Sequence, residues 1–260
     1  MNGSPPESDS GSAKPTAEEG AGNAWLTGHT PAAWSPRPLC VIGLAGGVGS
    51  GKSTVGAMFR DLGACVVESD EIGRHVLCTD EVRRTLREWW GDSVFGPDGL
   101  PDRARIAGRV FDDPDQRRRL EQLLHPLIGR ERRRRMDEAR RRPGVTAIVI
   151  DAPLLFEAGL DRECDAIVFV EAPESARRRR VATQRGWSED DWSRREAAQL
   201  PVEQKRRRAD YVCVNDADLE TLRRKVQDIF SQIVSRYRGS ESGACPTPAA
   251  ERETPGDISL

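Results

Sequence analysis

Residues 39–54 read LCVIGLAGGVGSGKST, an apolar run followed directly by a glycine-rich loop and a lysine. From Gly46 to Ser53 the loop fits the pattern G-x-x-x-x-G-K-S, whose backbone N–H groups surround phosphate. Glycine gives such a loop the unusual backbone angles that it needs. A helix expected from residue 53 to 62 would add the positive end of its dipole. The stretch therefore predicts a phosphate-binding loop between a strand and a helix.

The positions of this loop have separate expected roles. Lys52 can reach the β- and γ-phosphates of a nucleotide, and the Ser53 hydroxyl can bind Mg²⁺. The predicted nucleotide-binding residues are Gly46, Gly47, Val48, Gly49, Ser50, Gly51, Lys52, Ser53 and Thr54. A chance glycine-rich turn is the alternative interpretation. The apolar strand before the loop and the apolar helical stripe after it favour nucleotide binding.

Short apolar runs rich in Val, Ile, Ala and Cys recur along the chain and predict the strands. They span residues 39–45, 64–67, 146–150, 166–170 and 211–214. Nearly continuous apolar runs are typical of strands that are buried on both faces of a parallel sheet. Helical stretches separate the runs, so we expect an α/β fold with a five-stranded parallel sheet. Combined with the phosphate-binding loop, this pattern is typical of a P-loop NTPase core.

Two long gaps between the predicted strands indicate additions to this sheet. The gap at about 69–145 holds helical segments, expected near residues 79–90, 103–111 and 114–142. The gap at about 171–210 predicts two or three short helices around a turn at Gly186. The ends of the chain, 1–37 and 239–260, are rich in Gly, Ser, Pro and Glu. We expect them to be disordered tails on a domain of residues 38–238, because such segments cannot bury enough apolar surface.

The composition argues against several classes of protein. No apolar run approaches the roughly 18 residues that a membrane-spanning helix needs. The N-terminus lacks the apolar segment of a secretory signal. The six cysteines are scattered and form no C-x-x-C pair. We therefore expect a reduced, cytoplasmic protein with no membrane partner, no disulfide and no structural metal.

Two acidic residues follow predicted strands, at the edge of a parallel sheet where ligands gather. Asp70 comes just after the second strand, and Asp151 ends the third. An acid after an apolar strand is typical of a Walker-B Asp, which orients Mg²⁺. An acid that faces the γ-phosphate can instead accept the proton of an attacking hydroxyl. The alternatives are a helix cap at Asp70 and a turn residue before Pro153 at Asp151; Glu68 and Glu157 are weaker candidates, expected to be solvated or structural.

Arginine dominates the basic residues, because only four of the 40 are lysine. Runs such as 132–135 and 177–180 suggest nucleic-acid binding, but they are not interleaved with aromatic residues and have acidic residues close by. We interpret most of them as solvated helix faces with ion pairs and expect no nucleic-acid partner. Three arginines before the fifth strand, Arg180, Arg185 and Arg194, are candidates to stabilise charge on a transferred phosphoryl group.

The insertion contains the run LLHPLI from residue 123 to 128. We expect Pro126 to bend or start a helix there. His125 lies beside leucine side chains, and a histidine in such a setting is more often packed than ligating. On the residues alone, its role stays open between packing and binding.

Several further motifs accompany the loop along the chain. They are residues 43–55, Ser69–Asp70, HPLI at 125–128, DAPLLFE at 151–157, GWSE at 186–189, Gln199, Lys205, Ala209–Asp210 and Asn215. In this order they resemble the dephospho-CoA kinase family over about residues 39–237. The resemblance implies a P-loop kinase core, an acceptor-binding insertion at about 69–145 and a lid at about 171–210. It implies transfer of the γ-phosphoryl group of ATP to the ribose 3′-hydroxyl of dephospho-CoA, with Mg²⁺.

By the same resemblance, Asp70 matches the acid proposed to activate the acceptor hydroxyl, and Arg180 matches a lid arginine. His125 matches a histidine of the acceptor domain. The expected catalytic residues are Lys52, Asp70, Asp151 and Arg180; the expected acceptor-binding residues are Asp70, His125 and Asp151; and the expected Mg²⁺ ligands are Ser53 and Asp151. The sequence leaves open how Asp70 and Asp151 divide their roles.

The chain departs from the family pattern at three places. Glu68 stands where Asp is frequent, Ala45 where Thr is frequent, and Gln184 where a second lid arginine is frequent, although Arg185 can substitute for it. Two other functions stay open from the residues. One is another small-molecule P-loop kinase, such as a nucleoside-monophosphate kinase. The other is a nucleotide-dependent protein that binds RNA through its arginine runs. The oligomeric state is not indicated.

Overall fold

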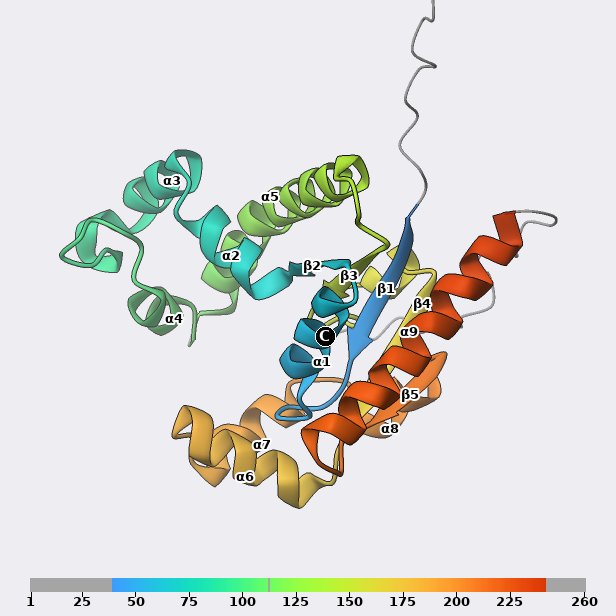
Figure 1. Ribbon diagram of the computed structural model, residues 1–260. Coiled ribbons are helices and arrows are strands. Elements are labelled where there is room, and N and C mark those ends of the chain that lie inside the picture. Colours follow the sequence, from blue (N-terminus) through green and yellow to red (C-terminus); the bar gives the residue numbers. More distant parts are fainter. Residues whose placement is uncertain (1–38, 112, 242–260) are drawn as a thin grey trace, which may run out of the picture. The chain divides into compact units, whose positions relative to one another are not determined.

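The core of the protein is a five-stranded sheet in the order β2-β3-β1-β4-β5, with all neighbours parallel. The computed structural model describes residues 39–111 and 113–241 (Figure 1). The strands are β1 (Cys40–Ala45), β2 (Ala64–Glu68), β3 (Ala147–Asp151), β4 (Ala166–Glu171) and β5 (Tyr211–Val214). The predicted α/β fold with a five-stranded parallel sheet is confirmed, and each strand lies within one residue of its expected bounds.

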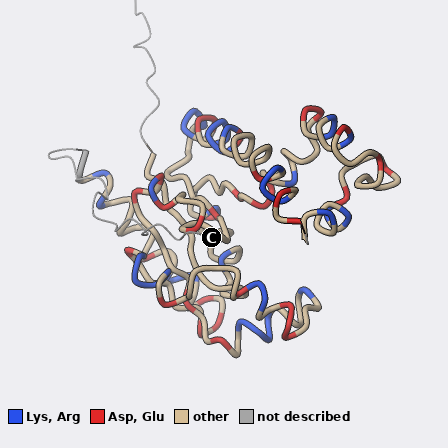
Figure 2. The backbone as a smooth tube through the Cα atoms, turned by 180° about the vertical axis from the view of Figure 1, so that it is seen from behind, with Lys and Arg blue, Asp and Glu red and all other residues tan. Residues whose placement is uncertain are grey.

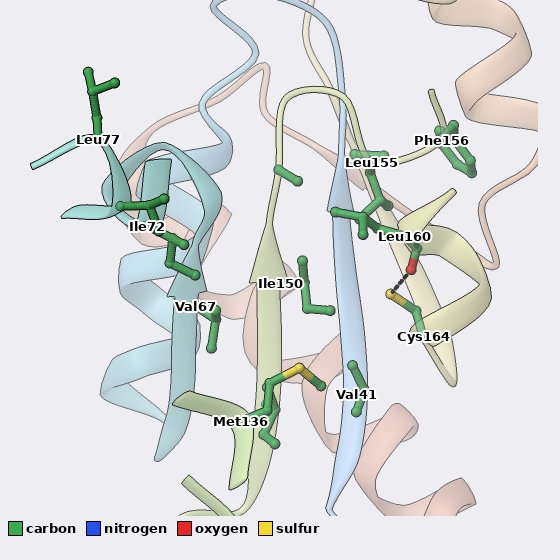
Figure 3. Close-up of a cluster of buried hydrophobic side chains, with 14 of the residues drawn as sticks. Val41, Val67, Ile72, Leu77, Met136, Ile150, Leu155, Phe156, Leu160 and Cys164 are labelled. Carbon is green, nitrogen blue, oxygen red and sulfur yellow. Dashed lines mark hydrogen bonds between the residues drawn. The ribbon is translucent and has the colours of Figure 1, made fainter. Parts of the chain in front are cut away.

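Both faces of the sheet are covered, which explains why the strands are apolar along their whole length. Successive side chains of a strand point to opposite faces. Thus Ile42 of β1 packs in a core with α1 (Lys52–Asp61) and α9 (Leu219–Glu241), whereas Val41 belongs to a second core. Figure 3 shows this second cluster, in which Val41 and Ile150 of the sheet gather with Met136.

The second core also holds one of the cysteines. Cys164 is buried, and its thiol donates a hydrogen bond of 3.2 Å to the carbonyl of Leu160 (Figure 3). Leu160 begins the short 3₁₀ helix η2 (Leu160–Glu163). The five cysteines within the described residues are all free thiols, so this part of the fold is held by packing and hydrogen bonds.

The insertion between β2 and β3 is helical, as predicted. Its elements are α2 (Ser69–Leu77), α3 (Asp80–Trp90), η1 (Gly91–Val94), α4 (Arg103–Phe111) and α5 (Pro114–Arg141). Figure 1 shows α2 leading away from the edge strand β2 and α5 returning beside it. Ile72 and Val76 of α2 share the second core with Met136 of α5, so the insertion packs on the same face of the sheet as Val41.

The expectation that Pro126 starts a helix is wrong, because α5 runs through it from Pro114 to Arg141. The helix starts instead at Pro114, and the carboxylate of the cap residue Asp113 accepts hydrogen bonds of 3.0 Å from the backbone N–H groups of Asp115 and Gln116. Proline fits the first turn of a helix, where its missing N–H is not needed. At Pro126 the loss of one donor is tolerated because the helix packs along its length against its neighbours.

The segment between β4 and β5 contains three short helices, as predicted. They are α6 (Glu174–Arg185), α7 (Glu189–Ala197) and α8 (Val202–Arg207). Gly186 ends α6 with a φ of +63°, the left-handed conformation that glycine favours. Ser188 then begins α7 with a reciprocal capping box to Asp191. We call α6 and α7 the lid, after the lid that the family resemblance implies at about 171–210, and their closing over a nucleotide stays a prediction.

Most of the arginine runs lie in ion pairs on helix surfaces. Arg134 and Arg135 both pair with Glu131, at 2.7 and 3.0 Å, and Arg140 pairs with Asp137 at 2.8 Å. Figure 2 shows basic and acidic residues interspersed along the helices. Most members of these runs therefore form solvated faces, the interpretation favoured from the sequence, whereas Arg132 and Arg177 are buried. Within residues 39–111 and 113–241, no helix is both long and apolar enough to cross a membrane.

The predicted tails lie outside the described residues, apart from residues 239–241, which complete α9.

Candidate active site

The glycine-rich loop connects β1 to α1, and its sequence is explained by its backbone and its neighbours. Gly49 and Gly51 have φ values of +79° and +97°, which disfavour any other residue. A Cβ on Gly51 would lie 2.3 Å from Nδ2 of Asn215, and a Cβ on Gly49 would lie 2.5 Å from the carbonyl oxygen of Arg177. The loop therefore has no room for side chains at these two positions.

Lys52 folds back over this loop. Its Nζ donates hydrogen bonds to the carbonyl oxygens of Gly46, at 2.9 Å, and Gly47, at 3.2 Å. Burial lowers the pKa of Lys52 to about 8, although the nearby Asp151 carboxylate opposes this shift. The charges of Lys205 and Arg185 also lower the pKa. Lys52 is thus a half-buried cation that an anion at the loop would stabilise.

Asp151 ends β3 beside the loop. It pairs in register with Leu44 of β1 and Glu68 of β2. Its Oδ2 would lie 4.0 Å from a Cβ placed on Gly56, so the carboxylate faces the first turns of α1. Burial raises the pKa of Asp151, Lys52 lowers it, and the charges of Glu68 and Asp70 raise it. The carboxylates of Glu68, Asp70 and Asp151 therefore lie within electrostatic reach of one another.

Asp70 is exposed in the first turn of α2, at the edge of this group. The alternative that Asp70 caps the helix is wrong, because Glu68 occupies the cap position and no cap side chain bonds to the helix. An acid in the first turn is favoured by the helix dipole. The exposed Asp70 lies within electrostatic reach of Asp151, and its role toward a substrate stays a prediction.

The structure distinguishes the three candidate lid arginines. Arg180 donates to the carbonyl oxygens of Ser50 at 3.2 Å and Asn215 at 3.1 Å, so it lies against the loop. The Arg185 guanidinium lies 5.0 Å from the ring centre of Trp187, still close enough to act on the pKa of Lys52. Arg194 pairs with Asp191 of its own helix at 2.8 Å.

The chain was compared with known proteins. A family model of dephospho-CoA kinase matches residues 40–221. The chain belongs to the dephospho-CoA kinase family. A dephospho-CoA kinase from Syntrophotalea carbinolica is 38% identical over 208 residues, which cover 79% of this chain and 98% of that protein. One from Corynebacterium glutamicum is 38% identical over 196 residues, which cover 75% and 98%.

Solved structures agree with the fold. A crystal structure from Thermus thermophilus is 34% identical, with a TM-score of 0.65 over 75% of this chain and 97% of that one. A dephospho-CoA kinase from Campylobacter jejuni is 19% identical, with a TM-score of 0.53 over 74% and 96%. The family resemblance found in the motifs is confirmed, and with it the kinase class: the activity of this family is the ATP-dependent phosphorylation of dephospho-CoA.

A second pair of lid residues, Arg177 and Glu196, also contacts the loop. Neither residue was singled out from the sequence. Arg177 is only 5% exposed and donates to the carbonyl oxygen of Val48 at 3.3 Å. It also forms an ion pair with Glu196, whose Oε2 accepts a 2.9 Å hydrogen bond from the Val48 N–H. Trp192 packs on Val48. Helical periodicity could have identified Arg177 from the sequence, since it places Arg177 on the same helix face as Arg180 and Val181.

A cavity of about 390 Å³ lies between the loop and the lid helices. Its lining includes Gly47, Trp192 and Glu196, together with the end of β4 and the start of α8. The lid therefore contacts the loop at Val48 and at Ser50, through Arg177 and Arg180, while a cavity remains beside Gly47.

His125 is exposed on α5, in the insertion. It makes no hydrogen bond or ion pair with any residue that the structure describes. The structure does not bring His125 to the phosphate loop, and its acceptor-binding role stays a prediction.

The residues at the loop fit a Mg²⁺ ion that arrives with a nucleotide. In the described ranges no group of three or more His, Cys, Asp or Glu side chains is placed to hold a metal. Mg²⁺ in phosphoryl-transfer sites takes one or two carboxylates, substrate phosphates and water, so it needs no such group. Ser53 is exposed at the start of α1, and Asp151 faces the same turns. The buried Ser50 Oγ also lacks a partner among the described residues, as expected of a group that awaits phosphate.

Proposed function

We propose that this chain transfers the γ-phosphoryl group of ATP to the ribose 3′-hydroxyl of dephospho-CoA and releases ADP and CoA. Family membership supports ATP and dephospho-CoA as substrates. The observation that carries the assignment of residues is the meeting of the loop, Lys52 and Asp151 at the carboxyl ends of β1 and β3. At this edge of the sheet the protein can hold one phosphate chain and one acceptor in line.

The loop and Lys52 bind the phosphates in this proposal. Backbone N–H groups of residues 46–54 surround the β- and γ-phosphates, and the Lys52 ammonium moves from the carbonyl oxygens of Gly46 and Gly47 to the phosphate oxygens. Ser53 and Asp151 would hold Mg²⁺, which, when bound, neutralises charge on the β- and γ-phosphates. These groups position the phosphoryl group and reduce repulsion toward the acceptor.

Asp70 is the proposed general base. It accepts the proton of the 3′-hydroxyl while the hydroxyl oxygen forms a bond to the γ-phosphorus. The bond from the γ-phosphorus to the bridging oxygen breaks, and that electron pair leaves with ADP. Asp70 suits this role better than Asp151, because Asp70 is exposed to the acceptor side and Asp151 faces Lys52.

The lid is proposed to exclude water during transfer. Arg180 and Arg177 already lie against the loop and can stabilise charge on the transferred group. Exclusion of water prevents hydrolysis of ATP in place of transfer. The insertion, about 69–145, is the proposed acceptor-binding part, since it places α2 with Asp70 beside β2.

One assay tests the substrate assignment. ADP release is measured with ATP and Mg²⁺ in the presence of dephospho-CoA, AMP, CMP or buffer alone. We expect strong stimulation by dephospho-CoA only. Stimulation by AMP or CMP instead would indicate a nucleoside-monophosphate kinase, and equal rates in all four reactions would contradict the proposal.

A further inference from the structure

Among the residues that the structure describes, Lys205 is the most completely buried charged residue, with 1% of it exposed. Lysine is almost never fully buried unless it is paired. Its Nζ lies 3.0 Å from Oε1 of Glu157 and 2.8 Å from Oε1 of Gln199. The carbonyl oxygen of Pro153 accepts a third, longer bond of 3.3 Å. Three acceptors meet the three N–H donors of the ammonium, so its hydrogen-bonding capacity is filled.

The partners of Lys205 come from two separate parts of the kinase. Pro153 and Glu157 belong to the segment that follows Asp151 at the end of β3. Gln199 lies between α7 and α8, where the lid joins the core. Lys205 itself is on α8. The ammonium therefore ties the segment after Asp151 to the C-terminal root of the lid.

Glu157 makes a second contact that strengthens this tie. Its Oε1 also accepts a 2.7 Å hydrogen bond from the backbone N–H of Leu200. The sequence predicts a solvated or structural role for Glu157, and its side chain is 21% exposed. One carboxylate thus fixes both the side chain of Lys205 and the backbone of the lid root.

We propose that Lys205, with Glu157 and Gln199, positions Asp151 and the root of the lid relative to each other for phosphoryl transfer. We call these three residues the lid-root bridge. The inference rests on the proposed function, because it assigns the bridge to that transfer. Asp151 is only two residues from Pro153, so a displacement at Pro153 moves the carboxylate that faces Lys52. A displacement of about 1 Å at a reacting group can cost about a hundredfold in rate.

Stability alone is a poor explanation for this buried charge. Replacement of a buried ion pair by apolar side chains of similar volume is often neutral or stabilising, because the charges no longer have to be desolvated. The lid-root bridge also lies close to the proposed site of phosphoryl transfer. The charge of Lys205 acts on the pKa of Lys52, although the two residues are far apart in sequence.

The test compares four variants of the full chain with the wild type. Lys205→Met removes the charge and all three donors at similar volume. Glu157→Gln removes the opposite charge but keeps an oxygen that can accept from Leu200. The double variant K205M/E157Q leaves no unpaired buried charge. Arg207→Met is the matched control, because it removes a positive charge from the same helix at an exposed position.

We measure kcat, KM for dephospho-CoA, the dissociation constant of ATP and the melting temperature of each. In K205M we expect kcat to fall about ten- to a hundredfold and KM for dephospho-CoA to rise. We expect the dissociation constant of ATP to change less than about twofold, because the loop is intact. The double variant should recover melting temperature but not kcat, and R207M should match the wild type.

The possible results distinguish a failure of the lid-root bridge from a failure of the proposed function on which it rests. A wild type that does not phosphorylate dephospho-CoA overturns both. An active wild type, with variants that lose melting temperature but keep kcat and KM, shows a purely structural tie and overturns the bridge alone. If K205M does not fold, E157Q decides: a severalfold loss of kcat at unchanged ATP affinity supports the bridge, and an unchanged kcat overturns it.

Discussion

The nucleotide side of the site and the acceptor side are built differently. On the nucleotide side, Arg177, Arg180 and Asn215 already bond to the loop backbone, and Asn215 Nδ2 donates to the Ser50 carbonyl at 2.8 Å. On the acceptor side, Asp70 and His125 are exposed on the helices of the insertion. The loop is therefore held by protein contacts, whereas the residues proposed to meet the acceptor are exposed, so we expect a preformed nucleotide site and an acceptor site that forms on binding. Changes on the two sides should therefore affect different kinetic constants.

The largest expected effect is on the acceptor side. Asp70→Asn removes the proposed base but keeps the shape of the side chain, so kcat should fall about a hundred- to ten-thousandfold. The dissociation constant of ATP should change little, because no hydrogen bond or ion pair joins Asp70 to the loop in the part of the chain that the structure describes. Steady-state kinetics and an ATP titration check this. Asp80→Asn removes the same charge from the first turn of the next helix and serves as the control; near-normal kcat in D70N would exclude Asp70 as the base.

The second prediction concerns the nucleotide side and the backbone conformation of its loop. Gly51→Ala places a Cβ 2.3 Å from Asn215 Nδ2 at a φ of +97°. The strain costs about 1–3 kcal/mol, so we expect ATP to bind about ten- to a hundredfold more weakly. Gly144→Ala is the matched control, with a φ of +82° and open space around it. Equal ATP affinity in G51A and the wild type would show that the nucleotide site is not preformed.

The local structure of the nucleotide side, a strand, a loop and a helix, could be predicted from the sequence for a physical reason. The loop, the strands and the acids at the strand ends are local sequence patterns. One continuous segment forms the phosphate-binding loop, and a buried strand is visible as a run of consecutive apolar residues. The contacts of Arg177 and Glu196 with Val48 join residues more than 120 positions apart. The Lys205 partners likewise lie on other segments. At Pro126 the sequence left a bend or a helix start open, and only the continuous helix α5 excludes the start.

A pH titration tests the charge on the nucleotide side. The pKa of Lys52 is about 8 in the free protein, so Lys52 is protonated below this pH and loses its charge above it. ATP favours the protonated form, and above pH 8 binding must restore the proton. The dissociation constant should then rise up to about tenfold per pH unit.

Calorimetry between pH 7 and pH 9.5, in buffers of different ionisation enthalpy, measures both the affinity and the uptake of the proton. Lys52→Arg keeps its charge over this range and should abolish the slope. A K52R slope equal to that of the wild type would assign the proton to another group.

The smallest effect concerns the lid contact at Val48. The Glu196 carboxylate accepts a hydrogen bond from the Val48 N–H of the loop and lies within electrostatic reach of Lys52. In the proposed function the phosphates of ATP come close to this position. Glu196→Gln keeps a hydrogen-bond acceptor and removes the negative charge. It also frees the Arg177 guanidinium from its ion pair. At pH 7, where Lys52 is charged, we expect ATP to bind about three- to tenfold more tightly, since removal of one screened charge near an anion is worth about 1 kcal/mol. An ATP titration checks this.

Trp192 fluorescence gives an independent measurement of the same change, because Trp192 lies on the lid helix α7 and packs on Val48. If Glu196 competes with phosphate for the loop, the Trp192 fluorescence change should come at lower ATP concentrations in E196Q than in the wild type. Glu203→Gln is the control, as it removes a carboxylate from the same cavity without contact to the loop. Weaker ATP binding in E196Q would mean that Glu196 holds the loop in its binding shape, and the nucleotide side would then owe its preformed geometry to the lid.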